Sequence, residues 1–520
     1  MSGEIRRFET DFRRLCIERG RQTALIEART GAQVAYHELD ALADSVAAGL
    51  AALGLKPGER IVSMLPSCIE AVVVMIAAFK YGFDFAPLAP HATPREFKNW
   101  TALVDARIVL TSEAAEAELR EMRGPSALPI VAIALDGRLS RLRGAEGTPL
   151  PAERSSRVYL MTSGTTGEPK AMVLDLDRLW SAGRAFVAEH DWLPNGARFL
   201  NYMPMFYLGG VFNLTLIPFA AGGSAVVAES FSGATLLGFW NLIQRFEVNV
   251  IWFVPTVLRG LLELDRRSTR RFVRQSIPSL ASAAFLGTAP IDLATKTEFE
   301  KRFEIRLLEN FALSETTFIT TERIGDAARR SDRSVGQVLP YVEFRLGPEM
   351  TGVRAREIQV RSPYLFLGYL ASGGQIQLPL DANGWFSTGD LGRIDGGVVV
   401  IEGRNRDVIK KGGLLVSLAE VERVAELHDC VVEATALPIH HEFYGEDLVV
   451  CVRVKPGSPK DVTAQIQGFL VANLLKHKWP NKVVEIDEVP RTATGKTRKN
   501  ELIARLGLSP IRTAQAPESS

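Results

Sequence analysis

The chain has 520 residues, a length that predicts two or three domains. It is 46% hydrophobic and 23% charged, as globular proteins are, and its 61 basic and 60 acidic residues give a net charge of +1. This balance argues against nucleic acid or an anionic membrane as its partner.

The N-terminal stretch "MSGEIRRFETDFRRL" is charged and has no apolar core, so it does not have the pattern of a signal peptide. The cysteines are scattered, without a CxxC pair, which is typical of incidental thiols in a reducing compartment. They are Cys16, Cys68, Cys430 and Cys451. We therefore expect a cytoplasmic protein.

The first third of the chain alternates candidate strands and helices. Residues 33–53 predict a strand followed by a helix, and "CIEAVVVMIAAFKYG" predicts a buried helix that ends at a glycine. This alternation predicts a parallel sheet with helices on its faces. The other candidate strands are "RIVSML", "DFAPLAP", "ARIVLTS" and "PIVAIAL".

Two segments further along the chain need separate structural interpretation. Residues 139–156 have the composition of an exposed linker. Residues 201–228 carry no charge, and a membrane helix is conceivable at that length. Because Gly and Pro, including Pro204 and Pro218, interrupt the stretch, we expect buried helix and strand in an α/β core instead.

The sequence pattern changes twice in the last third of the chain. Residues 346–403 combine short apolar runs with Gly-rich turns and predict a β-rich subdomain. A new unit begins near residue 404, in which "LAEVERVAEL" and "DVTAQIQGFLVANLL" predict helices, and "VVEATALPI" and "DLVVCVRVK" predict strands. We expect residues 509–520 to be disordered.

The stretch "TSGTTGEPK", residues 162–170, has the composition of a phosphate-binding loop. Its glycines allow backbone N–H groups to approach an anion, its hydroxyls are further donors, and its lysine adds positive charge. It lacks the Walker spacing, and so does the GKT at 495–497, because Pro490 stands where that motif needs glycine. By composition alone, a flexible surface loop is an equally good interpretation.

Six segments in order distinguish the two interpretations, because they resemble the signature motifs of the adenylate-forming (AMP-binding) superfamily. This superfamily contains acyl-CoA synthetases, peptide-synthetase adenylation domains and luciferases. The resemblance covers about residues 30–505 and points to an acyl-CoA synthetase or fatty-acid–CoA ligase. The segments are "YLMTSGTTGEPK", "LGTAPI" (286–291), "NFALSETT" (310–317), "GWFSTGDLG" (384–392), "GRNRDVIKKGG" (403–413) and "PRTATGKTRKNEL" (490–502).

The resemblance implies an α/β fold with two domains. Residues 1–403 would form a large N-terminal adenylation domain of mostly parallel sheets flanked by helices, with the β-rich subdomain at 346–403. Residues 404–520 would form a small, mobile α+β C-terminal domain. The active site would lie between the two, and Arg406 would be the hinge residue, where the family usually has Asp or Lys.

The resemblance also implies the reaction. ATP, with Mg2+, would activate a carboxylic acid to an acyl-adenylate with release of pyrophosphate, and the thiol of CoA would then accept the acyl group. The alternative acceptor is a separate carrier protein. No carrier segment follows residue 505 and no long insertion lies between 317 and 357, which favours CoA. A non-catalytic acyl- or nucleotide-binding homologue and a luciferase-like oxidation are the remaining alternatives.

The family's functional residues have matches in this sequence. Lys496 matches the lysine that bridges substrate carboxylate and α-phosphate, Glu315 with Thr162 matches the Mg2+ ligands, and Asp390 with Arg404 matches the ribose-binding residues. The triphosphate would lie against Thr162, Ser163, Gly164, Thr165, Thr166, Gly167 and Lys170. The adenine would lie between the loop of Gly287, Thr288, Ala289 and Pro290 and the segment of Asn310, Phe311, Ala312 and Ser314.

Each of these residues also has a plain structural interpretation. Glu315 could be a helix-start carboxylate, Asp390 a turn residue, Arg404 a solvated arginine and Lys496 a surface lysine in a basic tail. Their joint presence speaks against the non-catalytic alternative. Ala312 for Gly and Ser314 for Thr are small-for-small departures from the family's pattern.

The residues of the expected acyl pocket depart most from the family's usual pattern. Tyr207 stands where the family usually has His, and amino-acid-activating members carry an Asp there; a tyrosine argues for an uncharged acyl or aryl acid. Plain core packing is the other interpretation of Tyr207. We expect the pocket at Tyr207, Gly209, Gly287 and Leu313, running towards residues 251–255. The sequence leaves the acid and the oligomeric state open.

Overall fold

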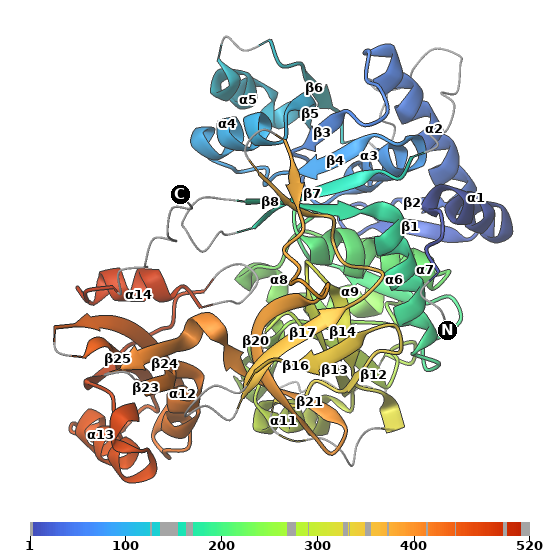
Figure 1. Ribbon diagram of the computed structural model, residues 1–520. Coiled ribbons are helices and arrows are strands. Elements are labelled where there is room, and N and C mark those ends of the chain that lie inside the picture. Colours follow the sequence, from blue (N-terminus) through green and yellow to red (C-terminus); the bar gives the residue numbers. More distant parts are fainter. Residues whose placement is uncertain are drawn as a thin grey trace.

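The computed structural model consists of a large body and a smaller one at the C-terminal end, coloured red-orange in Figure 1. The structure describes residues 4–124, 127–135, 154–162, 170–267, 277–289, 291–325, 331, 333–348, 355–371, 374–411, 414–442, 444–491 and 497–510. Most of the expected linker at 139–156 and most of the expected disordered segment at 509–520 lie outside these residues.

An eight-stranded sheet forms the upper part of the large body, in the order β19-β18-β8-β7-β4-β3-β5-β6. Its strands β4, β3, β5 and β6 are parallel, as the sequence predicted. The strands are β3 (Arg60–Ser63), β4 (Asp84–Pro87), β5 (Ala106–Ser112), β6 (Ile130–Ile133), β7 (Arg157–Thr162), β8 (Lys170–Asp175), β18 (Gly368–Leu370) and β19 (Ile376–Gln377).

Helices cover this sheet. Every residue of α3 (Ile69–Tyr81) is buried, and the helix ends at Gly82, whose φ of 72° suits the left-handed C-cap. Helix α2 (Tyr36–Ala52) packs beside α3, with Leu39, Val46 and Leu50 buried. Both helices agree with the sequence prediction. The others at this end are α1 (Phe8–Arg19), α4 (Pro94–Leu103), η1 (Glu113–Ala115) and α5 (Glu116–Arg123).

A second, four-stranded sheet contains the uncharged stretch 201–228. It has the order β2-β1-β10-β9, with strands β1 (Thr23–Glu27), β2 (Gln33–Ala35), β9 (Arg198–Asn201) and β10 (Ser224–Val227). Between β9 and β10 lie the π-helix η3 (Gly209–Leu216) and α7 (Ile217–Ala220), both largely buried. The stretch is therefore buried helix and strand, as expected. Within the part of the chain that the structure describes, no helix is long and apolar enough to cross a membrane.

The third sheet carries the candidate adenine-binding segments. Its order is β11-β12-β13-β14-β15, formed by β11 (Trp252–Phe253), β12 (Ala283–Leu286), β13 (Arg306–Leu313), β14 (Thr317–Thr321) and β15 (Gln337–Val338). The loop of the "LGTAPI" segment follows β12, and the turn that contains Glu315 joins β13 to β14. The accompanying helices are α6 (Leu176–Ala188), α8 (Gly233–Leu237), α9 (Phe239–Arg245), α10 (Pro255–Arg267) and α11 (Leu293–Phe303).

A four-stranded antiparallel sheet, β16-β17-β20-β21, follows in the chain. Its strands are β16 (Glu343–Leu346), β17 (Arg356–Arg361), β20 (Phe386–Asp395) and β21 (Val398–Arg404). The excursion between β17 and β20 does not stay with this sheet. Strand β18 pairs with β8 instead, so it brings Tyr369 opposite Met172, directly beside the candidate phosphate loop.

The small body has its own sheet and core. Strands β23-β22-β25-β24 form the sheet, and β26 pairs with β25. The predicted helices and strands are all present: α12 (Leu418–Glu426), β24 (Val431–His441), β25 (Gly445–Val454) and α13 (Val462–Asn473). The remaining elements are η6 (Asn405–Asp407), β22 (Val408–Lys411), β23 (Leu414–Ser417), η7 (Lys476–Lys478), β26 (Lys482–Glu485) and α14 (Lys499–Arg505).

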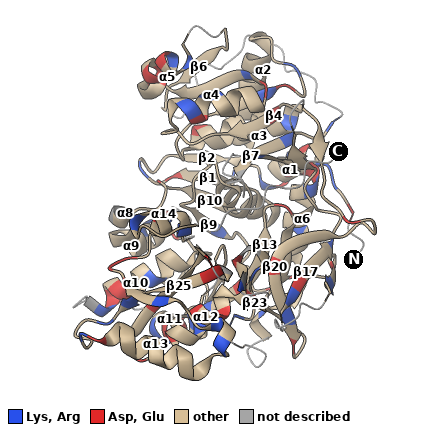
Figure 2. Ribbon diagram, turned by 60° about the vertical axis from the view of Figure 1, so that its left-hand side comes forward, with Lys and Arg blue, Asp and Glu red and all other residues tan. Residues whose placement is uncertain are grey.

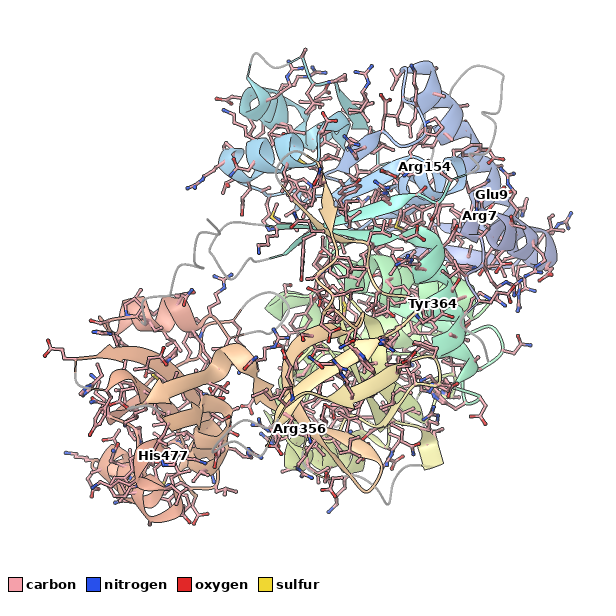
Figure 3. All side chains as sticks on the ribbon, viewed as in Figure 1. Arg7, Glu9, Arg154, Arg356, Tyr364 and His477 are labelled. Carbon is pink, nitrogen blue, oxygen red and sulfur yellow. The ribbon has the colours of Figure 1, made fainter. Side chains whose placement is uncertain are left out.

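Basic and acidic residues, blue and red on the ribbon of Figure 2, are spread over both bodies, in keeping with the near-zero net charge. Some of them join segments that are distant in sequence. Arg154, labelled in Figure 3, donates to Asp84 Oδ1 at 2.8 Å and to the carbonyl oxygen of Gly82 at 2.8 Å. Asp84 begins β4, so this contact anchors the chain just before β7.

Candidate active site

The candidate phosphate loop is framed by a β-hairpin. Thr162, the last residue of β7, pairs with Lys170, the first residue of β8, in an antiparallel register. The two residues therefore mark where the loop leaves and re-enters the sheet. Of the predicted loop residues, Ser163, Gly164, Thr165, Thr166 and Gly167 lie outside the described residues, as does the side chain of Thr162.

Glu315 lies within a polar cluster beside that hairpin. The hydroxyl of Tyr369 donates a hydrogen bond to Glu315 Oε1 at 2.7 Å, and the Lys170 ammonium lies 5.9 Å from the centroid of the Tyr369 ring. Burial, together with the negative charge of Glu315, raises the pKa of Tyr369, so its proton stays on the hydroxyl. Tyr369 thus joins the predicted phosphate lysine to the predicted metal carboxylate.

Tyr207 interacts electrostatically with the same carboxylate. Burial raises the pKa of Tyr207, and the charge of Glu315 contributes to the rise. Its backbone carbonyl accepts hydrogen bonds from the N–H groups of Gly210 and Val211 at 3.0 and 3.2 Å, in the turn that leads into the π-helix η3. Such π-helical turns are frequent at functional sites. The charge of Glu315 thus acts on a tyrosine from a distant part of the chain.

The donor set around Glu315 suits a magnesium ion that arrives with a nucleotide. The described part of the chain contains no group of three or more His, Cys, Asp or Glu side chains that could hold a metal by themselves. Mg2+ in nucleotide sites is commonly bound by one or two carboxylates and by substrate phosphates, with water completing the shell. A single carboxylate next to a phosphate loop fits that pattern.

A pocket opens at the edge of the third sheet. Five of its lining residues are predicted adenine-site residues, and four are additional. The predicted ones are Thr288, Ala289, Asn310, Phe311 and Ala312, and the additional ones are Glu309, Arg333, Val335 and Ile401. Four separate segments of the chain thus form one site.

The packing around this pocket explains why residue 287 is a glycine. It also leaves polar atoms available to a ligand. A Cβ on Gly287 would lie 2.7 Å from Asn310 Oδ1, so a larger residue would displace the asparagine. Thr288 Oγ1 and Asn310 Nδ2 are buried and have no hydrogen-bond partner among the described residues. Buried polar groups are normally paired, so these two are suited to a ligand that carries hydrogen-bonding groups, such as a purine. Pro290 lies outside the described residues.

Asp390 and Arg404 lie side by side, as their assignment to one ligand group requires. They face each other in the β20–β21 ladder, and Arg404 Nε donates to Asp390 Oδ1 at 2.9 Å. The Asp390 side chain is 5% exposed, whereas that of Arg404 is 36% exposed. The pair therefore has a buried carboxylate and a half-exposed guanidinium group.

The segment after Arg404 connects the two bodies. Glu402 in β21 accepts from Arg423 of α12 at 2.8 Å, and a Cβ on Gly403 would lie 2.9 Å from the Cβ of Ala419. The Lys499 ammonium lies 3.2 Å from both Asp407 and Glu422. Lys499 thus holds the beginning of α14 against the segment that contains Arg406, whose own side chain lies outside the description.

The predicted catalytic lysine, Lys496, lies outside the described residues, but both ends of its loop are described. Arg491 and Thr497 form an antiparallel bridge, and the N–H of Arg498 donates to the carbonyl of Pro490 at 2.8 Å. The loop 492–496 therefore starts and ends at one point of the small body, next to α14.

Family models match both bodies. The AMP-binding enzyme model matches residues 12–370, and the AMP-binding enzyme C-terminal domain model matches residues 420–496. The chain belongs to the AMP-binding enzymes. This confirms the superfamily that the sequence motifs indicated, and the α/β fold with a large N-terminal and a smaller C-terminal domain agrees with it.

Relatives of this AMP-binding enzyme include CoA ligases. It is 26% identical to 4-coumarate–CoA ligase of Pinus taeda over 94% of each chain. It is 26% identical to sulfoacetate–CoA ligase of Cupriavidus necator over 92% of this chain and 94% of the relative. The crystal structure of ATP-bound MatB from Rhodopseudomonas palustris matches with a TM-score of 0.83 at 26% identity, over 97% of this chain and 99% of that chain.

Sequence reasoning missed Tyr369 and four pocket residues. Tyr369 lies in an apolar run, "LFLGYL", that contains no charged residue to single it out. Arg333 and Ile401 reach the pocket through a long-range contact with each other, in which the N–H of Ile401 donates to the carbonyl of Arg333 at 3.1 Å. No local signal in the sequence would have found them.

Proposed function

We propose that this AMP-binding enzyme is an acid–thiol ligase that activates a carboxylic acid with ATP and transfers the acyl group to CoA. The observation that carries the proposal is the clustering of predicted residues: Thr288, Asn310 and Phe311 line one pocket, and Tyr369 donates to Glu315 while its ring lies beside Lys170. The CoA ligases among the relatives support the choice of acceptor.

In the first half-reaction, a carboxylate oxygen of the acid attacks the α-phosphorus of ATP, and pyrophosphate leaves. The residues would contribute by positioning and by fixed charge. The adenine would lie on the Phe311 face with Thr288 and Asn310 at its polar edge, and Asp390 would accept hydrogen bonds from the ribose hydroxyls. Lys170 would lie beside the phosphates.

Glu315, with Thr162, would hold Mg2+, which neutralises charge on the phosphate oxygens when bound. Tyr369 would keep the Glu315 carboxylate oriented through its hydrogen bond. Lys496 would bridge the two reacting anions; a compact charge on a flexible stem suits a group carried on a loop.

In the second half-reaction, the CoA thiol attacks the acyl carbon and AMP leaves. We propose that residues 1–403 form the adenylation domain and that 404–520 rotate about Arg406 between the two steps, since a short chain joint can absorb such a change. The contacts Glu402–Arg423 and Gly403–Ala419 would then be rearranged on rotation.

The test is ATP–pyrophosphate exchange with a panel of carboxylic acids, followed by product analysis with and without CoA. We expect exchange that depends on one acid and on Lys496, and we expect an acyl-CoA product when CoA is present. If CoA does not discharge the adenylate, the proposed acceptor becomes a carrier protein instead of CoA. Failure of exchange with every acid would overturn the ligase assignment.

A further inference from the structure

A second cavity lies between helices α1 and α6 and the turn that follows α7. Its volume is about 190 Å³. Among the described residues, it shares no lining residue with the pocket at the third sheet, so the two are separate features. Figure 1 shows α1 on the side of the large body that faces away from the small body. The charged residues that line this cavity are Asp11, Arg14, Glu18, Arg19 and Arg184.

Asp11 is a buried carboxylate on which several donors converge. Its side chain is 5% exposed. Asp11 Oδ1 accepts from Arg6 at 3.1 Å and from Arg14 at 3.0 Å. Asp11 Oδ2 accepts from Trp180 Nε1 at 3.0 Å, and Arg184 Nε lies 3.7 Å from it. One carboxylate therefore faces three guanidinium groups, and both of its oxygens are engaged.

The remaining two charges of the cavity have opposite signs. Glu18 Oε1 lies 3.8 Å from Arg14 Nε, and the Glu18 side chain is 62% exposed. Arg19 Nη1 donates to Gln22 Oε1 at 3.2 Å, and a Cβ on Gly222 would lie 2.5 Å from Arg19 Nη2. The Arg19 guanidinium thus packs on the turn after α7, where it is held in place. In this part of the described structure, four guanidinium groups surround two carboxylates, which leaves a surplus of positive charge.

Arg184 is the guanidinium that this surplus affects most clearly. Burial lowers the pKa of Arg184, Asp11 and Glu18 act in the opposite direction, and the like charges of Arg6 and Arg14 lower it further. Arginine stays charged at neutral pH in spite of such a shift. Its charged form is therefore less stable here than in water, and an anion in the cavity would stabilise it.

We infer that this cavity binds a phosphate-type oxyanion, orthophosphate or pyrophosphate, between the guanidinium groups of Arg14, Arg19 and Arg184. Guanidinium groups match the oxygens of phosphate with paired, charge-assisted hydrogen bonds. A volume of about 190 Å³ has room for such an anion, since a water molecule takes about 30 Å³ in the liquid. It has no room for a helix or strand of a partner protein. The inference does not depend on the proposed function.

The experiment titrates the full-length protein with sodium orthophosphate and, separately, with sodium pyrophosphate, at an ionic strength kept constant with sodium chloride. Calorimetry measures the Kd, and thermal unfolding measures the Tm. We expect at least one of the two anions to bind and to raise the Tm, because it binds the folded chain only. The comparison of the two titrations shows which anion the cavity prefers.

A variant assigns the binding to this cavity. Arg184→Gln removes one guanidinium and keeps a polar side chain, and we expect it to raise the Kd at least about tenfold. Arg266→Gln is the matched control: Arg266 is also a helical arginine, its side chain is 56% exposed, and its Nη2 lies 2.6 Å from Glu298 Oε2. It removes the same charge outside the cavity, so its Kd should not change.

The proposed active site also handles pyrophosphate, so only the part of the binding that depends on Arg184 counts. ATP should bind equally to Arg184→Gln and to the unmodified protein, which separates this cavity from the nucleotide pocket. Binding of neither anion overturns the inference, and so does an equal Kd in Arg184→Gln and Arg266→Gln. A tetraglutamate peptide that depends on Arg184 and binds more tightly than both anions would replace the small anion with an acidic protein segment. Loss of the ligase assignment leaves the inference in place.

Discussion

Replacing Tyr369 by phenylalanine isolates the contribution of one hydroxyl group to the proposed magnesium carboxylate. The substitution keeps the ring, and therefore the Lys170 contact at 5.9 Å, but removes the donor that lies 2.7 Å from Glu315 Oε1. Without it, Glu315 must be ordered by the incoming nucleotide. We expect the KM for MgATP to rise while the KM for the acid stays the same.

The size of the effect follows from the environment of the bond. A hydrogen bond to a charged group contributes about 1.5–3 kcal/mol when buried. Tyr369 is half-buried, so solvent screening reduces this to about 1–2 kcal/mol, which corresponds to a roughly five- to thirtyfold change in KM. The loss should be partly recovered at high free Mg2+, because mass action favours the metal-bound state.

The assay is pyrophosphate exchange at saturating acid with MgATP varied, repeated over a series of free Mg2+ concentrations. Tyr364→Phe is the matched control: Tyr364, labelled in Figure 3, precedes the same strand, is 4% exposed, and packs on Tyr341 with centroids 4.9 Å apart. An unchanged KM for MgATP in Tyr369→Phe, or an equal rise in Tyr364→Phe, would refute the positioning role.

Three further predictions concern the pocket and the core. Asp390→Ala should raise the KM for ATP about tenfold to a hundredfold, since it removes a charged acceptor, and leave the KM for the acid unchanged in the exchange assay. Gly287→Ala should weaken ATP binding about tenfold in calorimetric titration, because the added methyl group would lie 2.7 Å from Asn310 Oδ1 and displace the asparagine side chain. An unchanged affinity would contradict the adenine assignment. Burial lowers the pKa of His190 to about 3, so the native state keeps it neutral while the unfolded chain protonates below about pH 6.5. Stability should therefore fall as pH drops from 6.5 towards 3, by about 2 kcal/mol at pH 5 in urea unfolding, and His190→Gln should flatten this slope.

Local sequence patterns were sufficient to predict the helices and strands discussed next. The apolar run that became α3 is buried on all sides, and its glycine terminator adopts the left-handed conformation that L-residues avoid. The stretch 201–228 became η3, α7 and β10 inside the core because Gly and Pro divide it into short pieces. In both cases the periodicity and the punctuation lie within one segment, so the sequence alone could indicate them.

The family was also readable from the sequence, because its motifs are local strings in a fixed order. Two separated segments, one containing Thr288 and the other Asn310, were assigned to one adenine site from those strings, and the structure lines one pocket with both. The proximity of Asp390 and Arg404 was implied in the same way, and their hydrogen bond matches it.

Tertiary structure decided what lies between these segments. The return of β18 to β8 places Tyr369 against Glu315, and the stacking of Phe212 on Phe318 joins η3 to β14. Each of these contacts joins residues that are far apart in the chain, and each depends on strand pairing and ring packing that no single segment encodes. The sequence by itself determined the elements, the family and the chemistry to expect, whereas the contact of η3 with β14 and the support of the predicted metal carboxylate came from long-range packing.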